Sequence, residues 1–479
     1  MKRTLSISLI WLIAGFSLLE AQTRYDELTY PELNEFQVPD IETFELDNGI
    51  KFYLVEDNEL PLINMNVIVR AGSFMISNEK VGLASMTTQV MRNGGTKKYP
   101  EEELNELLEN RAARMEFGME LSSGSGSMNV LKEDFNNLLP VFIDLLKNPA
   151  FPEDKIDLAK TRTRSGISRR NDNAQSVASR EFSQLIYGEE SLYGRLIEYE
   201  TLSNITRDDM IEFHEQAFTG SNLMIGITGD FSAPQMKDAL QEAFSDYPKG
   251  TRNELDLPEV DYEFNSSINF IDKPDVNQSV VFMGHIGGLR DNPDYAALQA
   301  MNEILSGGSF SGRLMQTVRS EMGLAYSVFG SYQSNVQYKG QFYAGISTRS
   351  SATGEAINAV RDQIIRLQEE KVGEQELEEA KERILNSLVF RYDSKSSVLR
   401  ERMSYEYNGL PADAFEKYIE QLQDVTVDDI YRAANEYIQP GNMRVLVVGN
   451  ASEIGDQLDE FGDVNEIDIT IPRAQREDE

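Results

Sequence analysis

An internal repeat constrains this chain more than any other feature of its sequence. Residues 202–232 match residues 422–452 at a constant offset of 220 residues, with no gap. Thr206 and Thr426 occupy the same position in the two copies, and an Asp-Asp pair begins two residues after each of them. A threonine with a carboxylate three residues later caps a helix, and a β-branched run after a turn is typical of a strand. Each copy therefore predicts a capped helix, a turn and a strand.

Two further matches lie upstream, in the same order in both parts of the chain. Residues 151–160 match residues 372–381 at an offset of 221, and Gly94-Gly95 ends an apolar helical pattern as Gly307-Gly308 does. Chance matching of short segments is the alternative, but it would not preserve both the order and the offset. We conclude that one unit of about 210 residues, a common size for a domain, occurs twice.

Strands and helices alternate within each unit, which is typical of an α+β fold built here from two homologous α/β halves. Residues 44–55 form two apolar, alternating runs around Asn48-Gly49, a strong signal for a hairpin. In the first half we also expect a strand over 64–73 and helices near 79–92, 100–114, 132–147 and 153–170. In the second half we expect strands near 268–273, 278–285, 324–333 and 340–347, and helices near 353–370 and 374–391.

The junction between the halves has the composition of a linker. Residues 246–264 contain proline and are polar and acidic. We therefore place the N-terminal half at 22–245 and the C-terminal half at 265–465. A charged tail follows at 466–479.

The first 21 residues resemble a secretory signal peptide. Two basic residues precede the apolar run Leu5–Phe16, and Ala21 ends a passable cleavage site. This run is short for a membrane span, although a membrane anchor is the alternative reading. No other stretch could cross a bilayer, so we expect no membrane span after signal removal. The sequence thus predicts an exported protein, located in a bacterial periplasm.

Charge and residue counts exclude several classes of function. The chain has 45 Lys and Arg against 80 Asp and Glu, and its net charge of -35 argues against nucleic acid as a partner. There are no cysteines, which excludes disulfides and thiolate metal sites. His214 and His285 lie in different segments, so no zinc site can use two histidines of one helix. We expect His285 to be buried and hydrogen-bonded, and His214 to be exposed.

The stretch 81–96, VGLASMTTQVMRNGGT, predicts a helix that two glycines end. Ser85, Thr88 and Gln89 are spaced so that they share one face of this helix. A metal site would place its ligands with this spacing, yet these three residue types are poor ligands. From these three residues alone, a chance polar face is the interpretation that we would accept.

The duplicated α+β unit, the strand VIVRAGS at 67–73 and the glycine-ended helix together resemble the pitrilysin (insulinase) family of zinc metallopeptidases. The resemblance is to its processing-peptidase branch and covers nearly the whole mature chain. It implies a processing-peptidase-like metallohydrolase fold, with antiparallel sheets packed with helices in a clam-shell arrangement. Active members carry an inverted zinc motif, H-x-x-E-H, on this helix. Its two imidazoles bind one zinc, and the glutamate acts as base for the zinc-bound water.

In this chain the motif is degenerate. The resemblance assigns the first histidine position to Ser85, the glutamate position to Thr88 and the second histidine position to Gln89. The family takes a third ligand, a glutamate, from a later helix. That helix reads KTRTRSGISRR at 160–170, with no carboxylate and five basic residues, which would repel zinc. We therefore expect this chain to bind no metal and no other cofactor of its own.

The segment 307–332 carries the strongest resemblance to the family. Arg319 and Tyr326 lie seven residues apart within VRSEMGLAYS, and active members use an arginine and a tyrosine with this spacing to hold substrate beside the zinc. Both side chains are fixed donors that can bind a peptide carbonyl and the oxyanion that develops on it. From the residues alone, Arg319 could instead pair locally with Glu321, and Tyr326 could be an amphipathic strand residue. The spacing does not establish that the two side chains converge.

The leading hypothesis is a non-zinc subunit of an exported heterodimeric metallopeptidase, inactive alone. The partner would be a homologous subunit that bears H-x-x-E-H and zinc, and the substrates would be unfolded peptides. A catalytically silent scaffold or peptide-binding protein with the same fold is the alternative. A homodimeric hydrolase that uses unrelated residues is a third reading, which nothing in the sequence supports.

Overall fold

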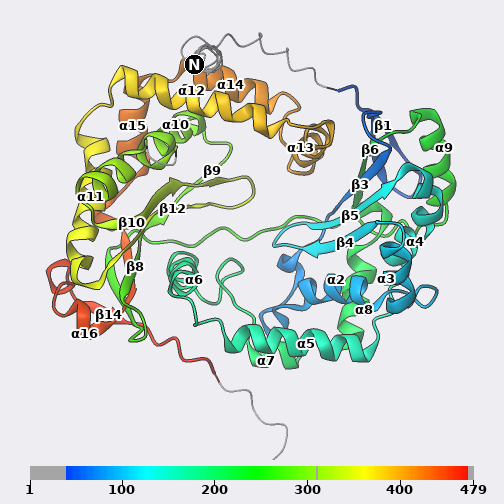
Figure 1. The fold of residues 1–479 in the computed structure, drawn as a ribbon, viewed down its shortest axis with the longest axis horizontal. Helices are drawn as coiled ribbons and strands as arrows, with labels where there is room; N and C mark the ends of the chain where they lie inside the picture. Colours follow the sequence, from blue (N-terminus) through cyan, green and yellow to red (C-terminus); the bar gives the residue numbers. More distant parts are fainter. Residues whose placement is uncertain (1–38, 309–310, 473–479) are drawn as a thin grey trace, which may run out of the picture. The chain divides into compact units, whose positions relative to one another are not determined.

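The computed structural model of the chain describes residues 39–308 and 311–472 (Figure 1). The described residues from Asp40 onward belong to one compact unit. The predicted signal peptide at 1–21 lies outside the described residues, as does the end of the charged tail. The domain boundaries proposed from the sequence stay a prediction, although residues 247–266 contain no helix or strand.

The first sheet has six strands in the order β1-β2-β6-β3-β5-β4. Its strands are β1 (Glu42–Glu45), β2 (Lys51–Glu56), β3 (Leu62–Val69), β4 (Arg114–Met119), β5 (Gly124–Leu131) and β6 (Leu223–Gly229). Neighbouring strands are antiparallel except for the parallel pair of β2 and β6. In β3 every second residue is buried, which is the two-residue period of a strand with one face on the core.

The second sheet repeats this arrangement, in the order β10-β12-β8-β13-β7-β14. Its strands are β7 (Ser267–Asp272), β8 (Gln278–Ile286), β10 (Ala325–Tyr332), β12 (Gln341–Arg349), β13 (Arg444–Gly449) and β14 (Val464–Glu466). The parallel pair recurs between β13 and β7, and the edge strand β14 is also parallel to β7, unlike β1 in the first sheet. Two short strands, β9 (Gly288–Leu289) and β11 (Ser334–Asn335), form a separate parallel pair. The predicted class, two homologous halves with sheets packed against helices, is confirmed.

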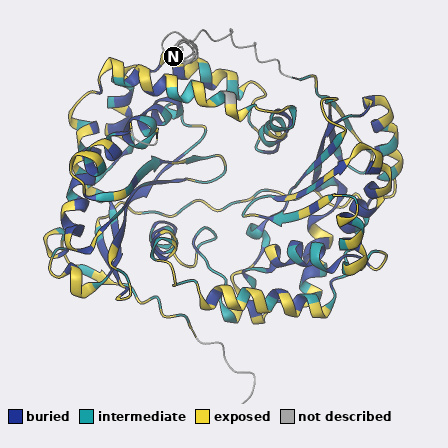
Figure 2. Ribbon diagram, viewed as in Figure 1, coloured by how far each residue is buried: buried dark blue, intermediate teal, exposed yellow. Residues whose placement is uncertain are grey.

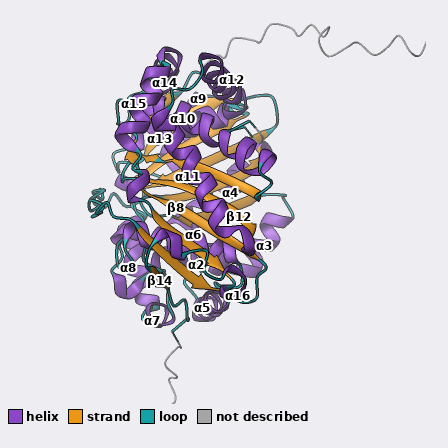
Figure 3. Cartoon of the chain, turned by 90° about the vertical axis from the view of Figure 1, so that its left-hand side faces the viewer, coloured by secondary structure: helices purple, strands orange, loops and turns teal. Residues whose placement is uncertain are grey.

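Helices cover one face of each sheet and enclose the two main cores (Figures 2 and 3). Apart from α6 (Ala174–Tyr187), the helices of the first half are α2 (Leu83–Gly94), α3 (Glu101–Glu109), α4 (Phe135–Lys147), α5 (Glu153–Ser168), α7 (Tyr199–Ser203), α8 (Arg207–Ala217) and α9 (Ala233–Ala243). Apart from α13 (Lys395–Tyr407), the helices of the second half are α10 (Tyr295–Ser306), α11 (Thr353–Glu369), α12 (Glu374–Arg391), α14 (Ala414–Asp424), α15 (Val427–Tyr437) and α16 (Ala451–Ile454). In Figure 3, α10 and α11 lie in front of the strands of the second sheet, which they contact.

Two helices are exchanged between the halves. Helix α6 (Ala174–Tyr187) packs against β8 and β13 of the second sheet, and α13 (Lys395–Tyr407) packs against β2 and β6 of the first (Figure 1). The approach of α13 is close: a Cβ atom on Gly226 of β6 would lie 2.3 Å from the sulfur of Met403. Any larger residue at this position would therefore have to displace the side chain of Met403.

The capping boxes predicted from the repeat are present in both copies. Thr206 accepts the N–H of Asp209 at 3.2 Å at the start of α8, and the Asp209 carboxylate accepts the N–H of Thr206 at 2.8 Å. Thr426 and Asp429 form the same two hydrogen bonds at the start of α15. The repeat therefore extends to individual side-chain hydrogen bonds.

The helix expected near residues 100–114 is shorter in the structure than the sequence predicted. It ends at Glu109, and β4 begins at Arg114 after a turn in which Ala112 has a φ of 48°. The hairpin of β4 and β5 was not predicted, because its glycine- and serine-rich sequence has the composition of a loop. The glycines serve close packing instead: a Cβ atom on Gly126 would lie 3.3 Å from both Phe117 and Val67.

The two capping boxes provide a matched stability test. Replacing Thr206 or Thr426 with alanine leaves a helix N–H without its acceptor, so each substitution should lower the free energy of unfolding by about 1 kcal/mol. Replacement with serine keeps the acceptor and should preserve most of that stability. Denaturant unfolding of the four variants measures both effects. An alanine variant as stable as the parent would contradict the assignment of the cap.

Candidate functional site

The positions of the degenerate zinc motif lie in the first two turns of α2. The hydroxyl of Ser85 donates to the carbonyl of Gly82 at 3.1 Å, and the hydroxyl of Thr88 donates to the carbonyl of Ser85 at 3.0 Å. Thr88 is buried, with 2% of its surface exposed, whereas Ser85 is exposed and Gln89 is half-buried. Both hydroxyls are thus used by the backbone of their own helix.

Helix α5 packs against α2. Its C-terminal part lies in the basic run of 160–170, which has no carboxylate, and Arg170, which follows the helix, forms an ion pair with Glu198 at 2.7 Å. Within residues 39–308 and 311–472, no group of three or more His, Cys, Asp or Glu side chains could hold a metal ion. The residues at the family's zinc positions therefore do not fit a zinc ion. The absence of bound zinc in the protein itself stays a prediction.

Arg319 and Tyr326 come close together in the second half. The guanidinium carbon of Arg319 lies 5.4 Å from the centre of the Tyr326 ring, within the range of a cation–π contact. The sequence left open whether these two side chains converge. The fold brings them together because Gly323, with a φ of 65°, turns the chain between the helical segment and β10.

Both residues lie on irregular backbone. Arg319 belongs to a π-helix, η6 (Leu314–Glu321), whose buried residues Leu314 and Val318 anchor it in the second core. The pairing of β10 with β12 shifts register between Ala325 and Ser327, which makes Tyr326 the extra residue of a β-bulge. Isolated π-helical turns and bulges occur often at functional sites, where they redirect a side chain.

The bulge places Tyr326 on the surface, with 80% of the residue exposed. Strand β10 is an edge strand of its sheet in the described structure. An edge strand presents unpaired backbone groups that can bind an extended peptide. Arg319, Tyr326 and this edge together could hold a peptide by its backbone. The zinc-motif positions lie elsewhere, because α2 packs against β4, α5 and α8, whereas η6 packs against β10, α10 and α11.

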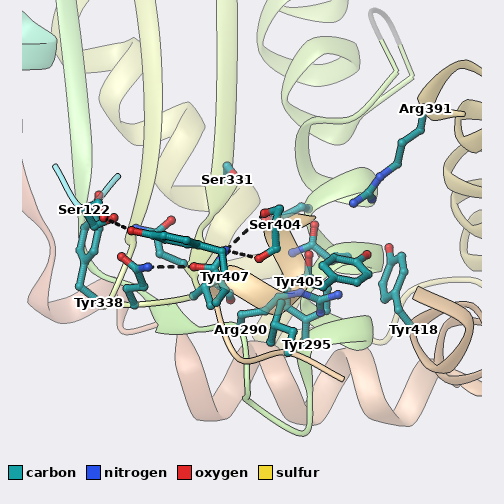
Figure 4. A pocket seen from close by; sticks show the side chains of 18 of the residues that line it. Ser122, Arg290, Tyr295, Ser331, Tyr338, Arg391, Ser404, Tyr405, Tyr407 and Tyr418 are labelled. Carbon is teal, nitrogen blue, oxygen red and sulfur yellow. Dashed lines mark hydrogen bonds between the residues drawn. The ribbon is translucent and has the colours of Figure 1, made fainter. Parts of the chain in front are cut away.

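A cavity of about 1030 Å³ lies between residues of both halves (Figure 4). The turn between β4 and β5, which contains Ser122, forms part of its wall, and α10, α12, α13 and residues of the segment 330–338 form most of the remainder. Tyr407, at the end of α13, donates its hydroxyl to the carbonyl of Ser122. Arg70 lies 4.5 Å from the centre of the Tyr407 ring and donates to its carbonyl at 3.1 Å. Burial raises the pKa of Tyr407 to about 12, so this phenol stays neutral.

No residue of this cavity was predicted from the sequence to belong to a functional site. Its wall includes Arg290, Tyr295, Tyr405 and Tyr418. The first two residues are separated from the last two by more than a hundred residues in the sequence. No local motif joins these segments, so only the tertiary structure could identify the site.

The two histidines are both buried. For His285 this confirms the prediction: Nδ1 donates to the carbonyl of Ile286 at 2.7 Å, and Nε2 accepts the N–H of Gln439 at 3.0 Å. For His214 the prediction of an exposed side chain is wrong, because only 6% of it is exposed and Nε2 donates to the carbonyl of Leu146 at 3.0 Å. The neighbouring glutamates suggested a surface position, but His214 lies on the buried face of α8. Burial lowers both pKa values to about 4, so neither imidazole is charged at neutral pH.

Comparisons with known proteins show the family to which this chain belongs. A profile of the insulinase family (peptidase family M16) matches residues 52–198, and a profile of the peptidase M16 inactive domain matches residues 204–384. The chain belongs to the peptidase M16 family.

The relatives span nearly the whole chain. The non-peptidase homolog YmxG of Helicobacter pylori is 25% identical over 446 residues, which cover 92% of this chain and 98% of that protein. The beta subunit of the mitochondrial-processing peptidase of Dictyostelium discoideum is 21% identical, over 87% of this chain and 90% of that protein. The crystal structure of a peptidase M16 inactive domain from Pseudomonas fluorescens superimposes with a TM-score of 0.77, at 24% identity, over 86% of this chain and 98% of that one. None of the helices within residues 39–308 and 311–472 is long and apolar enough to cross a membrane.

The buried histidines predict a pH dependence of stability. The folded-state pKa of His214 lies below its usual value of 6.5. Between about pH 6.5 and pH 4, its imidazole therefore binds a proton in the unfolded chain but stays neutral in the folded chain. This contribution to stability is complete above pH 6.5 and decreases as the pH falls, by up to about 3 kcal/mol. In His214→Phe the hydroxyl of Tyr247 still reaches the carbonyl of Leu146, at 3.2 Å. The variant should therefore lose less of its thermal midpoint than the parent between pH 7 and pH 5, as calorimetry would show. Parallel pH curves for the two proteins would refute this role.

Proposed function

We propose that this chain is the non-zinc subunit of an exported heterodimeric metallopeptidase. It closes the reaction chamber and presents Arg319 and Tyr326 to a peptide held at the zinc of a homologous partner subunit that carries H-x-x-E-H. The observation that carries the proposal is the close approach of Arg319 to Tyr326, on a π-helix and a β-bulge, in a chain whose zinc-motif positions are Ser85, Thr88 and Gln89.

The chemistry of the pair supports a role in substrate binding. The guanidinium and the phenol donate hydrogen bonds from fixed positions, and a peptide carbonyl accepts them more strongly as it develops negative charge. The exposed ring of Tyr326 is also a large aromatic surface that a bound peptide would cover. Neither residue supplies a nucleophile or a general base, so this subunit would need a partner for catalysis.

A catalytically silent scaffold or peptide-binding protein with the same fold is the second candidate. It is favoured by the name of the Helicobacter pylori relative, a non-peptidase homolog. The name of the Dictyostelium discoideum relative, a subunit of a processing peptidase, favours the two-chain enzyme instead. The predicted signal peptide supports a periplasmic location in either case.

Substitution of the pair separates these two functions. With the partner subunit present, Arg319→Ala and Tyr326→Ala should each lower kcat/KM for an unstructured peptide by about a hundredfold, the usual effect of removing one donor to an oxyanion. Gln316→Ala, which changes an exposed residue of the same π-helix, should leave turnover unchanged. Sedimentation analysis should show intact assembly for all three variants. Normal turnover in the assembled alanine variants would favour the scaffold.

The metal content of the chain provides a second test. Purified alone, it should contain no stoichiometric zinc and should not cleave unstructured peptides, because Ser85, Thr88 and Gln89 cannot ligate the ion. Elemental analysis and a peptide assay of the isolated and paired chains measure this. A lone preparation that binds one zinc and loses activity with a chelator would overturn the proposal.

A further inference from the structure

Arg290 lies in the wall of the cavity in Figure 4 and stacks on two tyrosine rings. It follows β9 and precedes α10, and it is half-buried in the cavity wall. Its guanidinium carbon lies 3.3 Å from the ring centre of Tyr295 and 5.3 Å from that of Tyr418. Stacking on ring faces fixes the plane of a guanidinium while its N–H groups, which point outward in that plane, remain available.

The guanidinium donors of Arg290 have no acceptor within the described chain. Its backbone N–H donates to the carbonyl of Asn335 at 2.8 Å. Among the hydrogen bonds and ion pairs of residues 39–308 and 311–472, none involves its guanidinium, and the nearby Asp294 is bonded to Arg432 at 2.6 Å. A half-buried charged group normally has a partner, because burial without one costs free energy.

The other charged groups of the wall are already paired. Glu303 accepts from Arg383 at 2.7 Å, and Arg391 forms an ion pair with Glu401. In the described part of the chain, Arg290 is therefore the charged lining residue without an ion-pair partner. The wall also contains the hydroxyl of Ser334, which is buried and has no hydrogen-bond partner there. A protein with a net charge of -35 thus presents a positive group in the wall of a large cavity that also contains an unsatisfied hydroxyl.

We propose that this cavity binds a peptide through one carboxylate, which Arg290 engages in a bidentate pair. The shape of a guanidinium matches a carboxylate, and such charge-assisted pairs are strong and directional. A volume of about 1030 Å³ is at the upper end of ligand pockets, which suits a short peptide segment. The tyrosines, serines and amide side chains of the wall suit a peptide backbone and uncharged side chains. The carboxylate is that of the peptide's C-terminus or of an Asp or Glu side chain.

This site is separate from Arg319 and Tyr326 and does not require a partner subunit. Binding to the isolated chain can therefore be measured whether or not the two-chain peptidase exists. Failure at Arg290 would leave the proposed function intact, and failure of the Arg319 and Tyr326 variants would leave this site intact.

Calorimetric titration of the purified full chain with a matched set of peptides tests the proposal. The peptides are N-acetylated sequences of glycine, alanine, serine and tyrosine that differ only in their carboxylates. One has a free C-terminus, one a C-terminal amide, and two are amidated with a single internal Glu or Gln. Loss of the carboxylate should weaken binding about ten- to hundredfold. The free-acid and Glu arms identify the source of the carboxylate, and inorganic phosphate serves as a competing anion.

Variants of the arginine locate the site. Arg290→Gln should reduce binding of the carboxylate peptides to the level of the amidated peptide, and Arg290→Lys should restore it only partly, because a lysine cannot form the bidentate pair. Arg366→Gln, which removes an exposed charge on α11, should bind as the parent does. Thermal midpoints confirm that each variant is folded. The proposal would be overturned if the carboxylate peptides bound no more tightly than the matched uncharged peptides, or if no peptide bound. It would also be overturned if the site bound only inorganic phosphate. The peptide comparison uses the parent protein and needs no variant.

Discussion

Each large sheet has a second face on which a helix from the other half of the chain packs. Val177 and Phe182 of α6 are buried against the second sheet, and Leu399 and Met403 of α13 against the first. Burial of each such side chain contributes about 1.5–3 kcal/mol. Together they match the net stability of an ordinary domain, about 5–15 kcal/mol. The two halves are therefore one cooperative structure, and the cavity exists because α13 brings Tyr405 and Tyr407 to the edge of the first half.

Most of the architecture could be predicted from the sequence because the same α+β unit occurs twice in the chain. Thr206 and Thr426 marked equivalent helices, and the predicted strands of the second half fall within two residues of β7, β8, β10 and β12. The failures have physical causes. Glycines in β5 indicate close packing between neighbouring strands, but a single sequence cannot distinguish this from a loop. The burial of His214 depends on which face of α8 meets the core, and the polar neighbours concealed that face.

One candidate site could be predicted from the sequence, and the other could be found only in the tertiary structure. Arg319 and Tyr326 were found through a motif, because both lie in one continuous segment. Their approach depends on a π-helix and a bulge, and neither irregularity has a reliable sequence signal. Arg290 was not found at all. Its stacking on Tyr295 and Tyr418 and its lack of an ion-pair partner among the described residues are properties of the tertiary structure, since Tyr418 comes from a distant segment.

The bulge in β10 has an evolutionary consequence. Side chains alternate between the two faces of a strand, so the orientation of Tyr326 depends on the number of residues before the regular pairing resumes at Ser327. Deletion of one residue there would turn the ring without altering any chemical group near it. A descendant of this chain could therefore keep the arginine and the tyrosine and still lose their alignment through a change in loop length. Substitutions are not the sole route by which such a pair decays.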